Sequence, residues 1–197
     1  MSCCSKSDKP KSGPLKISGN KSNEFKVVLI GDRSVGKTSI AQRFKQGVFN
    51  EGYELTIGGA YLKKTINLTD GRSVNMHLWD TGGEERYRAM VPLYYRDSQA
   101  AILVYDICDA ATFKSLDYWI NELQEKVKTD GMIILIVGNK CDKSEERKVS
   151  KEMAQSLSSN NNVMSFETSA KTGEGVNELF EYLGQKLYDE SIKKQGV

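Results

Sequence analysis

The sequence lacks any long hydrophobic run. No apolar stretch in its 197 residues approaches the ~20 residues of a membrane-spanning helix. The N-terminal residues also lack the apolar core of a secretory signal peptide. Cysteine is scarce, and Cys3, Cys4, Cys108 and Cys141 show no disulfide framework, which favours a reducing, cytosolic compartment. With 39% hydrophobic and 27% charged residues, the composition is typical of one soluble globular domain.

The N-terminal segment 1–23 is rich in lysine, serine, glycine and proline and has too few apolar residues for a core, so we expect a flexible tail. It carries five lysines and one acid, whereas the whole chain has a net charge of only +2. A basic tail on a mildly acidic domain argues against nucleic acid as a partner and favours an anionic membrane surface. A merely solvated leader is the alternative.

The signals for lipid attachment are incomplete. Cys3 and Cys4 lie near lysines and can accept palmitate, but residue 2 is serine, so the N-myristoylation pattern fails. The segment 189–197, which we expect to be a short C-terminal tail, contains no cysteine for prenylation. Two explanations are open: the natural chain extends beyond this sequence, or the protein uses Cys3, Cys4 and the lysines of its N-terminal tail to bind a membrane.

The segment Gly31–Thr38 reads G-x-x-x-x-G-K-T and lies between an apolar run, Phe25–Ile30, and an amphipathic one, Ser39–Gln46. A strand, a glycine-rich loop and a helix in this order form a P-loop, whose backbone N–H groups and helix N-terminus bind phosphates. The lysine can bridge the outer phosphates, and the threonine hydroxyl can ligate Mg²⁺. The candidate phosphate-binding residues are Gly31, Ser34, Val35, Gly36, Lys37, Thr38 and Ser39.

Short apolar segments alternate with amphipathic ones over residues 24–188. This alternation predicts a single α/β domain, with a mostly parallel six-stranded sheet, one antiparallel edge strand and helices on both faces. Asp70-Gly71 is typical of a hairpin turn between the two antiparallel strands. The expected strands are 25–30, 61–68, 74–79, 100–105, 132–137 and 163–166, and the expected helices are 36–46, 90–96, 112–128, 151–158 and 176–188. Ligands of such sheets bind at the carboxyl ends of the strands, where all the motifs of this chain fall.

Asp80 directly follows the apolar strand that ends at Trp79, the position from which a Walker-B carboxylate holds Mg²⁺. Helix capping is the alternative role for this acid. Thr56, in the glycine-rich stretch 49–59, is a candidate second hydroxyl ligand. The sequence therefore predicts a Mg²⁺ site formed by Thr38, Thr56 and Asp80.

The motif Asn139-Lys-Cys-Asp142 directly follows another apolar strand. The Asp142 carboxylate can accept two N–H bonds from the edge of guanine, a donor pair that adenine lacks, and a buried acid left unpaired penalises the wrong base. Asn139 can tie this segment to the P-loop, the stem of Lys140 can cover the base, and the segment 169–171 can supply a backbone N–H to the base oxygen. The candidate residues at the base and sugar are Phe49, Asn139, Lys140, Asp142, Ser169, Ala170 and Lys171.

Four segments follow the order found in small GTPases: GDRSVGKT, TIG at Thr56, WDTGGEERY, and NKCD with TSAK. Residues 25–188 therefore resemble the Ras superfamily. Within it, TIGGAYLKKTI, LWDTGGEERYRAM and LYYRDSQAAILVYDI are similar to the Rab branch, most of all to endosomal Rabs. The resemblance implies a G domain that binds GTP or GDP with Mg²⁺ and hydrolyses GTP. It adds Tyr53 and Gly83 to the nucleotide-binding candidates.

The resemblance also implies a molecular switch. Two loops, about 50–59 and 80–92, order around GTP and Mg²⁺ and relax on hydrolysis. Effector proteins, an exchange factor and a GTPase-activating protein would bind through residues about 50–61 and 79–94. The residues that match the aromatic triad shown by Rabs to effectors are Tyr61, Trp79 and Tyr94, for which ordinary core packing is the alternative. The implied protein is a cytoplasmic monomer in vesicle traffic, peripheral on the cytosolic face of endosomal or other vesicular membranes.

Two residues depart from the family pattern. Glu84 stands where Ras-like proteins have the glutamine that orients the attacking water, and a carboxylate has no N–H to offer a phosphate oxygen. Arg33 stands where a small residue is usual; it can block an arginine finger, pair with Glu84, supply charge in cis, or point to solvent. With Lys37, these are the candidate catalytic residues. We expect slow GTP hydrolysis; the alternatives are a GTP-locked binding scaffold and an ATP-using phosphotransferase, the latter opposed by Asp142.

Overall fold

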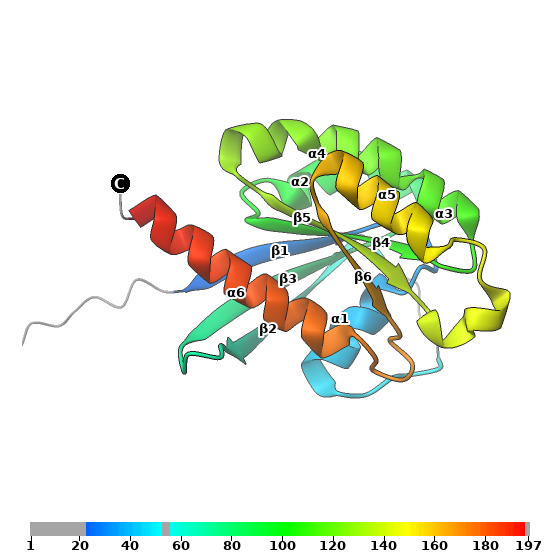
Figure 1. Cartoon of the computed structure of the whole chain (residues 1–197), viewed down its shortest axis with the longest axis horizontal. Helices are drawn as coiled ribbons and strands as arrows, with labels where there is room; N and C mark the ends of the chain where they lie inside the picture. Colours follow the sequence, from blue (N-terminus) through cyan, green and yellow to red (C-terminus); the bar gives the residue numbers. More distant parts are fainter. Residues whose placement is uncertain (1–22, 53–55, 196–197) are drawn as a thin grey trace, which may run out of the picture.

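The computed structural model describes residues 23–52 and 56–195. Its strands form one six-stranded sheet in the order β2-β3-β1-β4-β5-β6 (Figure 1). All neighbouring strands are parallel except β2 and β3, which confirms the predicted antiparallel edge. The strands are β1 (Glu24–Ile30), β2 (Gly59–Asn67), β3 (Ser73–Thr81), β4 (Ala100–Asp106), β5 (Ile133–Asn139) and β6 (Met164–Thr168).

Helices cover both faces of the sheet, as predicted (Figure 1). The α-helices are α1 (Lys37–Gln46), α2 (Val91–Tyr95), α3 (Ala110–Lys114), α4 (Leu116–Asp130), α5 (Lys151–Asn161) and α6 (Val176–Gln195). Two 3₁₀ helices, η1 (Glu85–Met90) and η2 (Cys141–Glu146), follow β3 and β5. Because α1, η1 and η2 each begin just beyond the carboxyl end of a strand, one edge of the sheet carries the candidate site.

The core has two layers because neighbouring residues of a strand point to opposite faces. Val27 and Leu29 of β1 belong to the layer under α1 and α6, whereas Val28 and Ile30 belong to the layer under α2, α4 and α5. In the first layer, Phe44 of α1 stacks on Phe180 of α6 with ring centroids 3.7 Å apart. The helix that follows the P-loop is thereby packed against the last helix of the chain.

Three helix predictions were wrong in extent, the least of them 151–158, since α5 continues to Asn161. The expected helix 112–128 is two helices, α3 and α4, which meet at Ser115. The Ser115 hydroxyl donates to Asp32 Oδ2 at 2.5 Å, and its oxygen lies 2.9 Å from the Thr112 carbonyl oxygen. A serine that satisfies backbone groups locally competes with a continuous helix. The expected tail 189–197 is helical as far as Gln195, because Glu190 pairs with Lys186 and Lys193 across single turns.

Candidate nucleotide-binding site

The P-loop curls tightly between β1 and α1. Gly31, Ser34 and Gly36 have positive φ angles of 151°, 62° and 95°. A Cβ at Gly31 would lie 2.2 Å from the Val104 carbonyl oxygen, and a Cβ at Gly36 would lie 2.2 Å from Asn139 Nδ2. Only glycine fits these two positions, and the resulting curl can aim several backbone N–H groups at one anion.

Lys37 lies inside this curl, only 5% exposed. Its Nζ donates to the carbonyl oxygens of Gly31 and Asp32, both at 2.8 Å. Burial lowers the pKa of Lys37 to about 8, against the opposing effect of Asp80 and Asp32. The backbone of Gly83 closes over the lysine, since a Cβ there would lie 2.5 Å from Nζ. The second glycine-rich loop therefore lies directly on the proposed phosphate-binding lysine.

The three predicted metal ligands come together. The Thr38 hydroxyl donates to Asp80 Oδ2 at 2.6 Å, and its oxygen lies 2.6 Å from the Thr56 hydroxyl. Asp80 is fully buried, and desolvation raises the pKa of its carboxyl. Its second oxygen, Oδ1, has no hydrogen-bond partner among the described residues. Two hydroxyls and a carboxylate with an unpaired buried oxygen suit a hard cation such as Mg²⁺.

Protein side chains alone do not complete a metal cage here. Within residues 23–52 and 56–195, no three His, Cys, Asp or Glu side chains gather around a common point. Mg²⁺ in nucleotide-binding proteins keeps few protein ligands and takes the others from phosphate and water. The residues present therefore fit a metal that arrives with a phosphorylated ligand.

Glu84 lies at the edge of the same cleft and is 16% exposed. Its Oε2 is 2.5 Å from Arg86 Nη2, and its Oε1 is 3.9 Å from Arg33 Nη1. The pairing of Arg33 with Glu84, one of the sequence alternatives, is present but long, and Arg33 is 58% exposed. Arg86 is the closer partner. It was not among the predicted site residues, although an arginine two residues from an acid is a visible signal.

Asn139 connects the phosphate end of the site to the base end, as predicted. Its Nδ2 donates to the Val35 carbonyl at 2.8 Å, and its Oδ1 accepts the Ala170 N–H at 3.2 Å and the Thr168 hydroxyl at 3.2 Å. The side chain is 1% exposed. One buried amide thus fixes the P-loop, β5 and the segment after β6 relative to one another.

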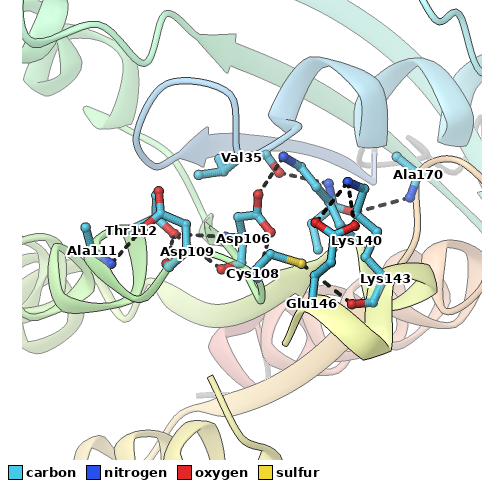
Figure 2. Close-up of polar contacts among 11 residues, drawn as sticks. Val35, Asp106, Cys108, Asp109, Ala111, Thr112, Lys140, Lys143, Glu146 and Ala170 are labelled. Carbon is cyan, nitrogen blue, oxygen red and sulfur yellow. Dashed lines mark hydrogen bonds and ion pairs between the residues drawn. The ribbon is translucent and has the colours of Figure 1, made fainter. Parts of the chain in front are cut away.

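The base end of the site is formed by the loops after β5 and β6. Ser169 donates its hydroxyl to Asp142 Oδ1 at 2.5 Å. Lys140 pairs with Asp106 at 2.6 Å (Figure 2). Asp142, the second residue of η2, is exposed, which contradicts the expectation of a buried acid. A bound base would itself have to supply the cover. Lys171 is also exposed, 3.8 Å from Glu51.

Arg43 was not among the predicted site residues, yet it supports the base end of the site. Its guanidinium donates to the Ala170 carbonyl at 2.8 Å, to the Lys171 carbonyl, and to the Gly47 carbonyl at 2.6 Å. The last turn of α1 therefore supports the loop at the base end. The only signal was a basic residue in the last turn of a helix, which usually serves the helix itself.

Three further candidates behave differently from one another. Phe49 is partly buried and packs against the core layer of α1 and α6. Ser39 lines a small cavity of about 20 Å³ together with Gly36, Thr56 and Glu84. Tyr53 lies outside the described residues. Larger hollows of about 440 and 490 Å³ lie away from the motifs, while the motif cleft is narrow because Lys37 and Gly83 fill it.

The predicted aromatic triad is assembled beside this cleft. The ring centroids of Tyr61 and Trp79 are 5.5 Å apart, and those of Trp79 and Tyr94 are 6.0 Å apart. Tyr61 is 50% exposed, and Ile57 and Leu93 nearby in sequence are exposed as well. The core alternative therefore does not hold for Tyr61.

A parallel sheet with a GKT loop after its first strand, connected by a buried asparagine to a second ligand-facing loop, is the arrangement of P-loop nucleotide-binding proteins. Residues 26–189 match the sequence model of the Ras family. The GTP-binding protein ypt5 of Schizosaccharomyces pombe is 44% identical over 163 residues, which cover 82% of this chain and 77% of that protein. The chain therefore belongs to the Ras family, and within it to the Rab branch that its sequence patterns indicated.

Family membership makes the protein a GTPase that binds GTP and GDP and acts as a Rab-type switch in vesicle traffic. Its classes of partner are effectors, exchange factors and GTPase-activating proteins. In the described part of the chain, no helix is long and apolar enough to cross a bilayer.

Proposed function

We propose that the protein is a slowly hydrolysing Rab-type switch that works as a monomer on endosomal membranes. The observation that carries the slow rate is the place of Glu84, at the mouth of the cleft that holds Lys37 and next to Gly83. The phosphates would bind to the P-loop from Gly31 to Ser39 and to Gly83. Guanine would bind to Asp142 and the backbone after β6, beneath the stem of Lys140.

The slow rate follows from the chemistry of Glu84. A carboxylate can accept a hydrogen bond from the attacking water, but it cannot donate one to the phosphate oxygens, and it places negative charge beside a polyanion. Its ion pairs with Arg86 and Arg33 offset that charge. A glutamine at this position can both accept a hydrogen bond from the water and donate one to a phosphate oxygen.

Glu84→Gln is expected to speed single-turnover GTP hydrolysis by about tenfold, equivalent to about 1.4 kcal/mol of barrier. The measurement is phosphate release from GTP-loaded full-length protein in one turnover. Glu85→Gln is the matched control, because Glu85 is the neighbouring exposed acid and should leave the rate unchanged. Equal rates for wild type and Glu84→Gln would disprove this account of Glu84. A wild type that releases no phosphate at all would favour the GTP-locked scaffold.

We also infer that Thr38, Thr56 and Asp80 hold Mg²⁺ together with the nucleotide phosphates. Removing Mg²⁺ with EDTA should speed GDP release from the wild type by about tenfold or more, since the ion neutralises phosphate charge. In Thr38→Ala this factor should shrink toward one. Thr65→Ala, which removes a hydroxyl bound to Asn75 on the exposed face of β2, is the control. An unchanged EDTA effect in Thr38→Ala would remove Thr38 from the metal site.

The membrane role is proposed from the sequence of the N-terminal tail, which lies outside the described residues apart from Asn23. Its five lysines suit the anionic cytosolic leaflet, and Cys3 and Cys4 can carry palmitate. One acyl chain gives only marginal membrane binding, so the basic residues would have to supply additional affinity for the membrane.

A further inference from the structure

Lys140 has an unusual conformation. It lies between β5 and η2 with φ 69° and ψ 35°, the left-handed region that few non-glycine residues adopt. Its ammonium is 2.6 Å from Asp106 Oδ2, a contact drawn in Figure 2. The register of the sheet explains the contact, because Asp106 at the end of β4 pairs with Asn139 at the end of β5, and Lys140 follows directly. The side chain therefore reaches back to the neighbouring strand.

Asp106 is itself fixed by the turn that follows β4. Its Oδ1 accepts the Cys108 N–H at 2.9 Å, its N–H donates to the Thr112 hydroxyl at 3.0 Å, and its carbonyl accepts the Asp109 N–H at 3.0 Å. The side chain is 13% exposed. These bonds fix both the backbone and the side chain of Asp106, so its carboxylate offers the Lys140 ammonium one defined position. Figure 2 shows these contacts side by side.

A largely buried ion pair of this kind is weak evidence for stability, because desolvation offsets much of the attraction. What it does impose is geometry. A free lysine would lose the rotamer freedom of its side chain when a base packed against its stem, and that loss would weaken binding. An anchored lysine has lost this freedom before the ligand arrives.

We propose that Asp106 is a positioning residue for guanine-nucleotide binding, which anchors the Lys140 ammonium so that the methylene stem is already laid along the base site. The proposal rests on the place given above to Lys140 over the base. Asp106 does not touch the nucleotide in this account. It acts on affinity through Lys140 and leaves the choice of base to Asp142.

The test is the release rate of fluorescently labelled GDP from the full-length protein. Asp106→Asn keeps an oxygen for the Cys108 N–H but removes the charge that holds Lys140. Release should become about 3- to 10-fold faster, the equivalent of ordering one flexible side chain. The preference for GDP over ADP should stay unchanged, because Asp142 is intact.

A double-mutant cycle separates positioning from a merely structural role. Lys140→Met should also speed release, and adding Asp106→Asn to Lys140→Met should produce no further change. Asp109→Asn is the control, because Asp109 caps α3 through the Ala111 N–H and does not contact Lys140. Unchanged release in Asp106→Asn, or the same acceleration in both backgrounds, would overturn the proposal. Wild-type release from Lys140→Met would instead overturn the place of Lys140 over the base.

Discussion

Asp142→Ala is expected to abolish the preference for guanine over adenine nucleotides and to weaken GDP binding by about 100-fold or more. Two hydrogen bonds to a charged acceptor are lost, each worth about 1.5–3 kcal/mol. Adenine nucleotides never made these bonds, so their affinity should hardly change. The measurement is equilibrium competition between labelled GDP and unlabelled GDP or ADP.

The geometry of the site makes Asp142 more than an exposed acid. Its Oδ1 is held by Ser169 at 2.5 Å, and the same serine oxygen accepts the Thr172 N–H at 3.0 Å. The carboxylate is therefore fixed before a base reaches it. Glu145→Ala is the matched control, since Glu145 is an exposed acid of the same 3₁₀ helix. If Asp142→Ala still discriminated like the wild type, base recognition would have to lie elsewhere.

A substitution that swaps specificity gives a sharper version of this test. Asp142→Asn replaces one acceptor oxygen by an N–H donor. Xanthine carries a carbonyl where guanine carries the amino group, so the asparagine matches xanthine and mismatches guanine. Xanthosine diphosphate should therefore compete better than GDP in this variant.

Asn139→Ala is expected to lower the free energy of unfolding by about 2–4 kcal/mol and to weaken GDP binding strongly. The buried Val35 carbonyl and Ala170 N–H would each lose their partner, at about 1–3 kcal/mol per group. Because these groups belong to the phosphate end and the base end, both halves of the site would loosen. The measurement is denaturant unfolding at one fixed concentration of GDP, since bound ligand adds to apparent stability.

The control for this variant is Asn161→Ala. Asn161 also donates from its side chain to a backbone carbonyl, that of Leu157 at 2.9 Å, but it does so at the end of α5, away from the motifs. Its loss should cost about 1 kcal/mol and leave GDP affinity unchanged. An Asn139→Ala protein as stable as Asn161→Ala, with normal GDP binding, would contradict the bridging role.

Most of the sheet could be predicted from the sequence, because each buried strand is a short apolar run and periodicity is a local signal. The order of motifs along the chain was also enough to predict that Asn139 meets the P-loop and that Thr38 meets Asp80. The break at Ser115 and the extension of α6 were missed, since each depends on particular side-chain contacts rather than on a pattern. The tail predicted for residues 1–23 lies outside the described residues, apart from Asn23.

The contacts of Arg43 and Asp106 could not be predicted for a different reason. Each is a charged residue whose partner lies on another segment, and charged residues at such positions are usually solvated. Only the register of β4 against β5 brings Asp106 to Lys140, and only the turn of α1 brings Arg43 to the Ala170 carbonyl. The motifs predict which segments approach one another. The distances between particular side chains depend on the folded chain.

The first helix has a consequence for how nucleotide exchange can be driven. Its first turn contains Lys37 and Thr38, and its last turn contains Arg43, which holds the carbonyls of Ala170 and Lys171. One helix therefore contributes to both the phosphate end and the base end of the proposed nucleotide site. A partner protein that displaced the C-terminal end of α1 would disturb both ends of the site at once, without entering the site itself.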